Sequence, residues 1–120
     1  MDYLDLTRVA FDRAGNLPFG VQKKVELARA LAMDPTLLLL DEPACGLNHE
    51  EVTELGDVIQ NIREDRNMTI LLVEHHMGLV ISICDTIVAL NFGRKIVEGA
   101  PIVVKTDAEL IGAYLGAEQR

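Results

Sequence analysis

The stretch LLLLDEPACGLN, residues 37–48, decides the fold class of this chain. Four successive leucines are typical of a parallel strand that is buried on both faces. The run stops at the acidic pair Asp41 and Glu42, and Pro43 follows at once. Because ligands of open α/β sheets gather outside the carboxyl ends of the strands, we expect these two carboxylates to belong to a site.

A second apolar run, TILLV at residues 69–73, leads into three polar residues at positions 74–76. Between the two runs, Asn48 with Glu51 three places on predicts a helix start, and apolar residues continue at helical spacing through residue 62. A strand–helix–strand order implies parallel pairing with a right-handed crossover. The sequence therefore predicts an α/β fold in which two strand ends deliver polar side chains to one edge.

The other elements are read from apolar spacing and from turn residues. Composition suggests no linker and no repeat, so we expect the 120 residues to form part of a single domain. The predicted elements are a helix over residues 2–14, a helix over 22–33, a short helix over 77–84, a hairpin over 86–99 with its turn at Gly93, and a helix capped by Thr106 and Glu109 that runs to about residue 115.

Charge and composition exclude several classes of protein. The formal net charge of −8 argues against a nucleic-acid surface, which needs clustered Lys and Arg. No apolar run approaches the roughly 18 residues that a membrane span requires, and no signal peptide is visible. Cys45 and Cys84 lack the spacing of a metal or redox site. We expect a cytosolic chain with reduced thiols.

The polar residues at the strand ends allow more than one interpretation. An isolated acidic pair such as Asp41 and Glu42 is as often a solvent-facing end of a core strand as it is part of a functional site. A metal cluster of residues 74–76 is a further possibility, although it lacks the i, i+4 spacing of helical zinc sites. A phospho-acceptor module with Asp41 as the acceptor would need further acids near an N-terminal strand and a late lysine, and neither arrangement is present.

The motifs taken together resemble a known family. LPFGVQKKVELARALAMDPTLLLLDEPACGLN, with TILLVEHHM downstream, resembles the nucleotide-binding subunit of ABC transporters. Three short motifs are similar to those of the ATPases of branched-chain amino-acid uptake systems. They are Gly-Leu-Asn at residues 46–48, Glu-His at residues 74–75 before a short helix, and Ala-Tyr-Leu-Gly at residues 113–116. The resemblance covers residues 17–116. It implies an ATP-hydrolysing subunit on the inner face of the plasma membrane, bound to membrane permease subunits and paired with a second ATP-binding subunit.

The resemblance assigns roles to individual residues. Asp41 would help to coordinate Mg²⁺, and Glu42 would be the general base or water-positioning residue for attack on the γ-phosphate of ATP. His75 would donate a hydrogen bond to that phosphate. Residues 44–48 match the D-loop, which connects the two ATPase subunits of a dimer, and Asn48 in it would help to bind nucleotide in that dimer. Together these parts fit phosphoryl transfer, which depends mainly on positioning and charge stabilisation.

The signature motif of the family matches residues 17–22 with a departure. Gly20 and Gln22 fit the pattern and would contact nucleotide held mainly by the other subunit, whereas Pro18 stands where serine is usual. Proline offers neither a hydroxyl nor a backbone N–H, so signature function is weakened. On this reading residues 1–34 end the helical subdomain, and residues 35–120 are the later part of the ATPase core.

The sequence also lacks a central part of the family. It contains no Gly-Lys pair and hence no G-x-x-x-x-G-K-[ST] phosphate loop. We therefore expect the C-terminal half of an ATPase domain, which alone would be inactive and would use ATP and Mg²⁺ only in the complete domain. The alternative is a non-catalytic truncated or regulatory fragment that associates with other ATPase subunits.

Overall fold

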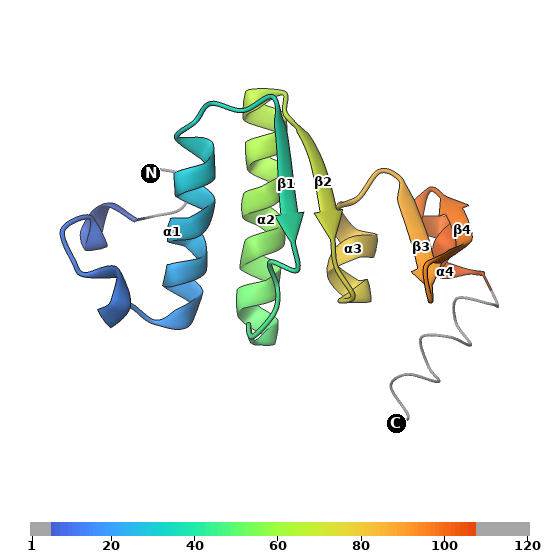
Figure 1. Ribbon diagram of the computed structural model, residues 1–120, viewed down its shortest axis with the longest axis horizontal. Coiled ribbons are helices and arrows are strands. Elements are labelled where there is room, and N and C mark those ends of the chain that lie inside the picture. Colours follow the sequence, from blue (N-terminus) through green and yellow to red (C-terminus); the bar gives the residue numbers. More distant parts are fainter. Residues whose placement is uncertain (1–5, 108–120) are drawn as a thin grey trace. The chain divides into compact units, whose positions relative to one another are not determined.

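The computed structural model describes residues 6–107, and the chain divides into two compact units, residues 1–75 and 76–120. Each unit is described by itself (Figure 1). In order along the chain, the first unit contains the 3-10 turns η2 (Thr7–Val9) and η3 (Ala14–Asn16), helix α1 (Phe19–Leu31), strand β1 (Leu37–Asp41), helix α2 (His49–Arg66) and strand β2 (Thr69–Val73).

Strands β1 and β2 pair in parallel, and α2 forms the connection between them. The register sets Leu37 opposite Thr69 and Asp41 opposite Val73, so both strands end at the same edge. Figure 1 shows the two arrows side by side and pointing the same way. The predicted strands, their bounds and their parallel pairing are confirmed.

The core of the first unit lies on one face of this two-stranded sheet. Leu38 of β1 packs with Ile62 of α2, which has no exposed surface. Two leucines of α1, Leu27 and Leu31, and Leu6 near the beginning of the chain complete the cluster with Met68. Helices α1 and α2 therefore cover one face of the sheet, and this packing fixes the position of the strand ends relative to the helices.

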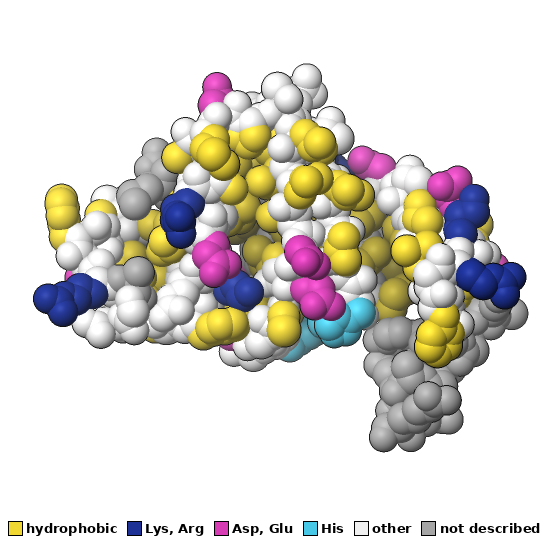
Figure 2. Space-filling view, in the orientation of Figure 1, with side chains coloured by type: hydrophobic (Ala, Val, Ile, Leu, Met, Phe, Trp, Pro, Cys, Tyr) yellow, Lys and Arg dark blue, Asp and Glu magenta, His cyan; other side chains and the backbone are white. Residues whose placement is uncertain are grey.

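Unbroken apolar runs are typical of strands that are buried on both faces, but β1 and β2 bury only one face within the described residues. Leu38 is 4% exposed, but its neighbour Leu39 is 64% exposed and the cross-strand partner Leu71 is 59% exposed. Successive side chains of a strand point to opposite faces, and the core cluster covers only one of them. Figure 2 shows hydrophobic side chains gathered over the uncovered face. The apolar sequence would suit a strand that is buried on both faces, whereas other elements pack against only one face.

Two helix predictions need correction. The predicted helix over residues 2–14 does not form in its described part, where only the short turn η2 and the first residue of η3 are helical. Leu6 is buried there, but Phe11 is fully exposed, so this segment has no continuous apolar face to bury. Helix α1 begins at Phe19, earlier than predicted, because Pro18 occupies its N-cap position and its extended backbone leads into the first turn.

The second unit contains helix α3 (Met77–Ile83), strands β3 (Ile87–Asn91) and β4 (Arg94–Gly99), and helix α4 (Pro101–Lys105). The predicted hairpin is confirmed: β3 and β4 are antiparallel, and the turn residues Phe92 and Gly93 have φ values of 51° and 77°. Positive φ at both central residues is the geometry that favours glycine in a tight hairpin.

Helix α4 was not anticipated. It begins with Pro101, whose missing N–H costs nothing in a first turn, and it buries Val104 completely. The Thr106 hydroxyl donates back to the carbonyl oxygens of Ile102 and Val103. The predicted helix through residue 115 lies outside the described residues from residue 108 on. Within the described range, no helix has both the length and the apolar character that crossing a membrane requires.

The uncovered face of β1 and β2 generates the first prediction. Replacing the cross-strand pair by Leu39→Gln with Leu71→Gln should shift the 120-residue chain toward smaller species, since contiguous exposed apolar surface drives association. Each substitution should change the free energy of unfolding by less than about 0.5 kcal/mol, because neither side chain lies in the core. Sedimentation velocity at several concentrations measures the distribution. Phe11→Gln, which removes an exposed side chain outside the strands, is the control; equal distributions for the double variant and the wild type would contradict the prediction.

Candidate functional site

The acidic pair lies at the end of β1, where the chain leaves the sheet. Glu42 donates its N–H to the carbonyl oxygen of Val73 at 2.7 Å, which extends the parallel ladder by one residue. Its backbone then turns into the left-handed region with φ 48°. A non-glycine residue in this conformation costs about 1 kcal/mol or more and often marks a functional site. The turn directs the Glu42 side chain away from the path of the strand.

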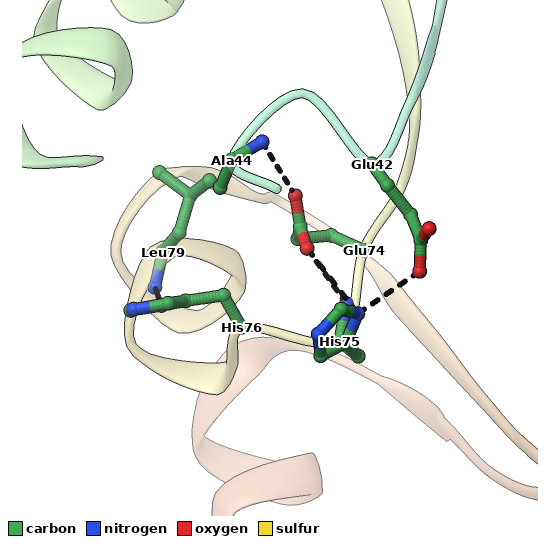
Figure 3. Close-up of polar contacts among 6 residues, drawn as sticks. All are labelled: Glu42, Ala44, Glu74, His75, His76 and Leu79. Carbon is green, nitrogen blue, oxygen red and sulfur yellow. Dashed lines mark hydrogen bonds and ion pairs between the residues drawn. The ribbon is translucent and has the colours of Figure 1, made fainter. Parts of the chain in front are cut away.

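This turn brings Glu42 to the histidine that follows β2. Glu42 Oε1 lies 2.9 Å from His75 Nδ1 (Figure 3), and the His75 side chain is 76% exposed. With a proton on Nδ1, the imidazole donates to the carboxylate and leaves Nε2 for another partner. Two of the residues predicted to act on phosphate, 33 positions apart in sequence, therefore contact each other.

Glu74 has a part in this site that sequence reasoning missed. Its side chain is only 1% exposed although the residue as a whole is half-buried, because its backbone remains accessible. One carboxylate oxygen accepts from the Ala44 N–H at 3.1 Å, and the other accepts from the His75 N–H at 3.0 Å. The signal in the sequence is an acid directly after an apolar strand, which by itself indicates only a candidate metal ligand.

The metal cluster considered for residues 74–76 does not form. Glu74 points to the backbone of Ala44, whereas His76 caps α3 by accepting the Leu79 N–H on Nδ1 at 3.2 Å (Figure 3). In the part of the chain that the structure describes, no three His, Cys, Asp or Glu residues are placed to hold a metal ion. Asp41 is exposed at the strand end, and among the described residues it belongs to no such group of metal ligands.

The predicted signature segment begins helix α1. Gln22 donates from Nε2 to the carbonyl oxygen of Leu17 at 2.9 Å, which closes the loop around Pro18. The Phe19 ring lies against Gly46, where any Cβ would approach the ring to 2.7 Å. The signature segment and the loop after the acidic pair are thus in direct contact within one chain.

The predicted D-loop ends in a capping box. Asn48 Oδ1 accepts from the Glu51 N–H at 2.9 Å, and Glu51 Oε1 accepts from the Asn48 N–H at 3.1 Å. This confirms the helix start predicted at Asn48. It also means that the side chains of Gln22 and Asn48, both predicted nucleotide contacts, are engaged inside the chain.

A surface pocket of about 220 Å³ joins the two segments. Pro18 and Gly20 of the signature segment line it together with Leu47 of the D-loop. Its charge is mixed, because basic side chains face acidic ones, and Lys24 pairs with Glu54 at 3.7 Å. The pocket therefore has no strong preference for an anion in this state.

The geometry matches solved structures. An ATP-binding cassette of an ABC transporter in its ADP conformation aligns over 96% of this chain and 46% of its own, with a TM-score of 0.86 and 26% identity. CbiO1 from Clostridium perfringens, part of an ABC transporter complex, aligns over 92% of this chain and 44% of its own with a TM-score of 0.82 and 29% identity. A family model described as ABC transporter matches residues 1–45. The chain belongs to the ABC transporter ATP-binding domains.

Among curated ABC proteins, BraF of Pseudomonas aeruginosa, a high-affinity branched-chain amino acid transport ATP-binding protein, is 41% identical over 116 residues. LivG of Escherichia coli, which carries the same description, is 40% identical over 116 residues. Both alignments cover 97% of this ABC chain and 46% of the relative. The chain thus spans about half the length of the curated relatives that it matches.

The contact between Gly20 and Glu51 generates the second prediction. A Cβ at Gly20 would overlap the Glu51 carboxylate, so Gly20→Ala should displace that flexible side chain and break half of the capping box. We expect a loss of roughly 0.5–1 kcal/mol in the free energy of unfolding, measured by urea denaturation. In a Glu51→Ala background the same substitution should be neutral or stabilising, because the obstacle is gone and alanine favours a helix more than glycine does. Equal costs in the two backgrounds would show that the carboxylate is not the cause.

Proposed function

We propose that this chain supplies the water-activating half of an ATP-hydrolysing site in an ABC import subunit. The observation that carries the proposal is the 2.9 Å contact between Glu42 and His75 at the ends of two parallel strands. A carboxylate that orients water and an imidazole that reaches phosphate are both needed for attack on a γ-phosphate. Their mutual hydrogen bond supports a shared role.

The donor set suits ATP with Mg²⁺ in a particular way. Asp41 is an exposed carboxylate at a strand end, and the described residues form no protein-only metal cage. Mg²⁺ is commonly held by one or two carboxylates together with water and substrate phosphates. Asp41 would therefore hold Mg²⁺ together with ATP, and the bound ion would neutralise charge on the phosphates. ATP and Mg²⁺ are cofactors of the complete domain in this proposal.

Glu42 and His75 then divide the work on the γ-phosphate. Glu42 accepts a hydrogen bond or a proton from the attacking water, since its carboxylate is partly exposed and its backbone is fixed by Val73. His75 would donate from Nε2 to a phosphate oxygen while its Nδ1–H donates to Glu42, so the imidazole would carry a proton on both nitrogens. Each residue fixes the orientation of the other, which is the principal contribution that a protein makes to phosphoryl transfer.

The signature and D-loop segments would act on nucleotide of a second ATP-binding subunit. Pro18 contributes no N–H, so the contact would come from the Gly20 backbone and the free N–H groups at the start of α1. Gln22 and Asn48 would shape these segments through the bonds that their side chains already make. The contact between Phe19 and Gly46 supports a joint surface.

The relatives suggest what the whole protein does. BraF and LivG are described as branched-chain amino acid transport ATP-binding proteins, so we propose uptake of branched-chain amino acids as the coupled process. The partners would be membrane permease subunits, with the ATP-binding subunit on their cytoplasmic side. Association would rest on protein contacts.

The third prediction tests Glu42 in a chimera that joins residues 1–120 to the phosphate-loop half of BraF. Glu42→Gln should leave ATP binding within about twofold and lower kcat by at least about 100-fold, a typical loss for a general base. The amide keeps the size of the side chain but cannot take a proton. Phosphate release and nucleotide titration measure the two quantities. Glu50→Gln, a neighbouring exposed acid on α2, is the matched control; near-normal turnover of Glu42→Gln would remove Glu42 from the base role.

The fourth prediction concerns the 120 residues alone. They should show negligible ATP hydrolysis and weak Mg²⁺–ATP binding, because Glu42 and His75 can orient only a phosphate that other groups hold. Calorimetric titration and phosphate release, compared with the chimera, measure this. Micromolar binding with turnover would contradict the prediction. An inactive chimera would instead favour the alternative function, a non-catalytic chain that associates with other ATPase subunits.

A further inference from the structure

We infer that Glu74 is a positioning residue, whose buried carboxylate ties the loop carrying Glu42 to the backbone of His75. It accepts the Ala44 N–H on one oxygen at 3.1 Å and the His75 N–H on the other at 3.0 Å. Figure 3 shows the carboxylate between the two segments. The bridge between the two segments is independent of the proposed function, whereas the effect of Glu74 on ATP hydrolysis rests on that function.

The carboxylate is suited to this task because it is buried and charged. With 1% of its side chain exposed, Glu74 is shielded from water that would compete for its oxygens. Hydrogen bonds to an ionised acceptor are stronger than bonds between neutral groups, and low local polarity strengthens them further. A neutral amide in this place would offer one oxygen to two N–H donors and would turn its own NH₂ group toward one of them.

The two bonds act on the segments that the catalytic proposal needs. Ala44 follows Glu42 by two residues, after a left-handed turn. Three other backbone hydrogen bonds hold this described loop: Glu42 N–H to the Val73 carbonyl, Cys45 N–H to the Glu42 carbonyl at 3.1 Å, and Leu47 N–H to the Ala44 carbonyl at 3.1 Å. His75 is fixed at its backbone by Glu74, whereas its ring contacts Glu42. Glu74 thus closes a ring of contacts that runs from Glu42 through His75 and back through Ala44.

The same carboxylate also shapes the surroundings of the imidazole. Glu74 Oε1 lies 3.7 Å from His75 Nδ1, beyond hydrogen-bond length, whereas Glu42 Oε1 lies at 2.9 Å. Because a carboxylate can only accept, the shorter contact with Glu42 makes Nδ1 the donor of that hydrogen bond. The two carboxylate oxygens of Glu74 accept backbone N–H groups of Ala44 and His75, so its effect is exerted through the backbone of these two neighbours.

The fifth prediction is tested first by amide hydrogen exchange of the 120-residue chain, resolved at Ala44 and His75 by NMR. Glu74→Gln should accelerate exchange at both amides about tenfold, the change expected from losing roughly one charge-assisted hydrogen bond. Exchange at Ile62 in the core should not change. Glu64→Gln, which removes an exposed acid from α2, should alter none of these rates. Unchanged exchange at Ala44 and His75 in Glu74→Gln would overturn the inference.

A shorter acid keeps the test decisive if the glutamine variant does not fold. Glu74→Asp preserves the charge but lacks the length to span both donors, so one of the two amides should stay protected while the other exchanges faster. Full protection of both amides in Glu74→Asp would overturn the bridging role.

The consequence for hydrolysis is measured in the BraF chimera. Glu74→Gln should lower kcat about tenfold and change KM for ATP less than about twofold, and Glu74→Asp should recover part of kcat. Altered amides with unchanged kcat would overturn the positioning role. A wild-type chimera without ATPase activity, combined with the expected exchange pattern, would sink the proposed function and leave the bridge between Ala44 and His75 supported.

Discussion

The parallel pairing of β1 with β2 is the constraint on which the rest of this ABC domain depends. Its register sets Asp41 opposite Val73, so two segments that are far apart in sequence end at one edge. The Glu42 N–H then adds one further bond to Val73 before the chain turns. Without this register, Glu42 and His75 would have no common position. The core beneath, centred on Leu38 and Ile62, holds the strands to α2 and makes the register unique, since a slip by one residue would exchange the buried and exposed faces.

The edge of the sheet where β1 and β2 end contains both a buried, hydrogen-bonded carboxylate and exposed polar side chains. Glu74 is buried and bonded to backbone, whereas His75 is largely exposed and bonded through its ring. A buried charge is tolerated only when its bonds are satisfied, and this one is satisfied by two N–H groups from the segments that must be oriented. The exposed residues at the same edge remain available to a substrate. This division between a buried support and an accessible pair suits the phosphoryl-transfer role that we propose for this edge.

The signature segment and the D-loop show a second kind of coupling, made by close approach. Gly46 leaves space for the Phe19 ring, and Gly20 leaves space for the Glu51 carboxylate. Both contacts need a residue without a Cβ, and at Gly46 the positive φ of 82° adds a conformational reason for glycine. The start of α1 therefore packs directly against the loop that leads away from Glu42. In the proposed subunit pair, these are the segments that would face the partner.

The sequence by itself determined the strands, their parallel order, the capping box at Asn48 and the hairpin, because each depends on local apolar spacing or on a short-range hydrogen bond. It also indicated Asp41, Glu42 and His75 as strand-end residues, although their role in ATP hydrolysis stays a prediction. Tertiary structure decided the exposure of Leu39 and Leu71, since an apolar run cannot state which of its faces other elements will cover. It also decided the use of Glu74 and the contact of Gly20 with Glu51. Both depend on the approach of segments about thirty residues apart, and no local pattern encodes that distance.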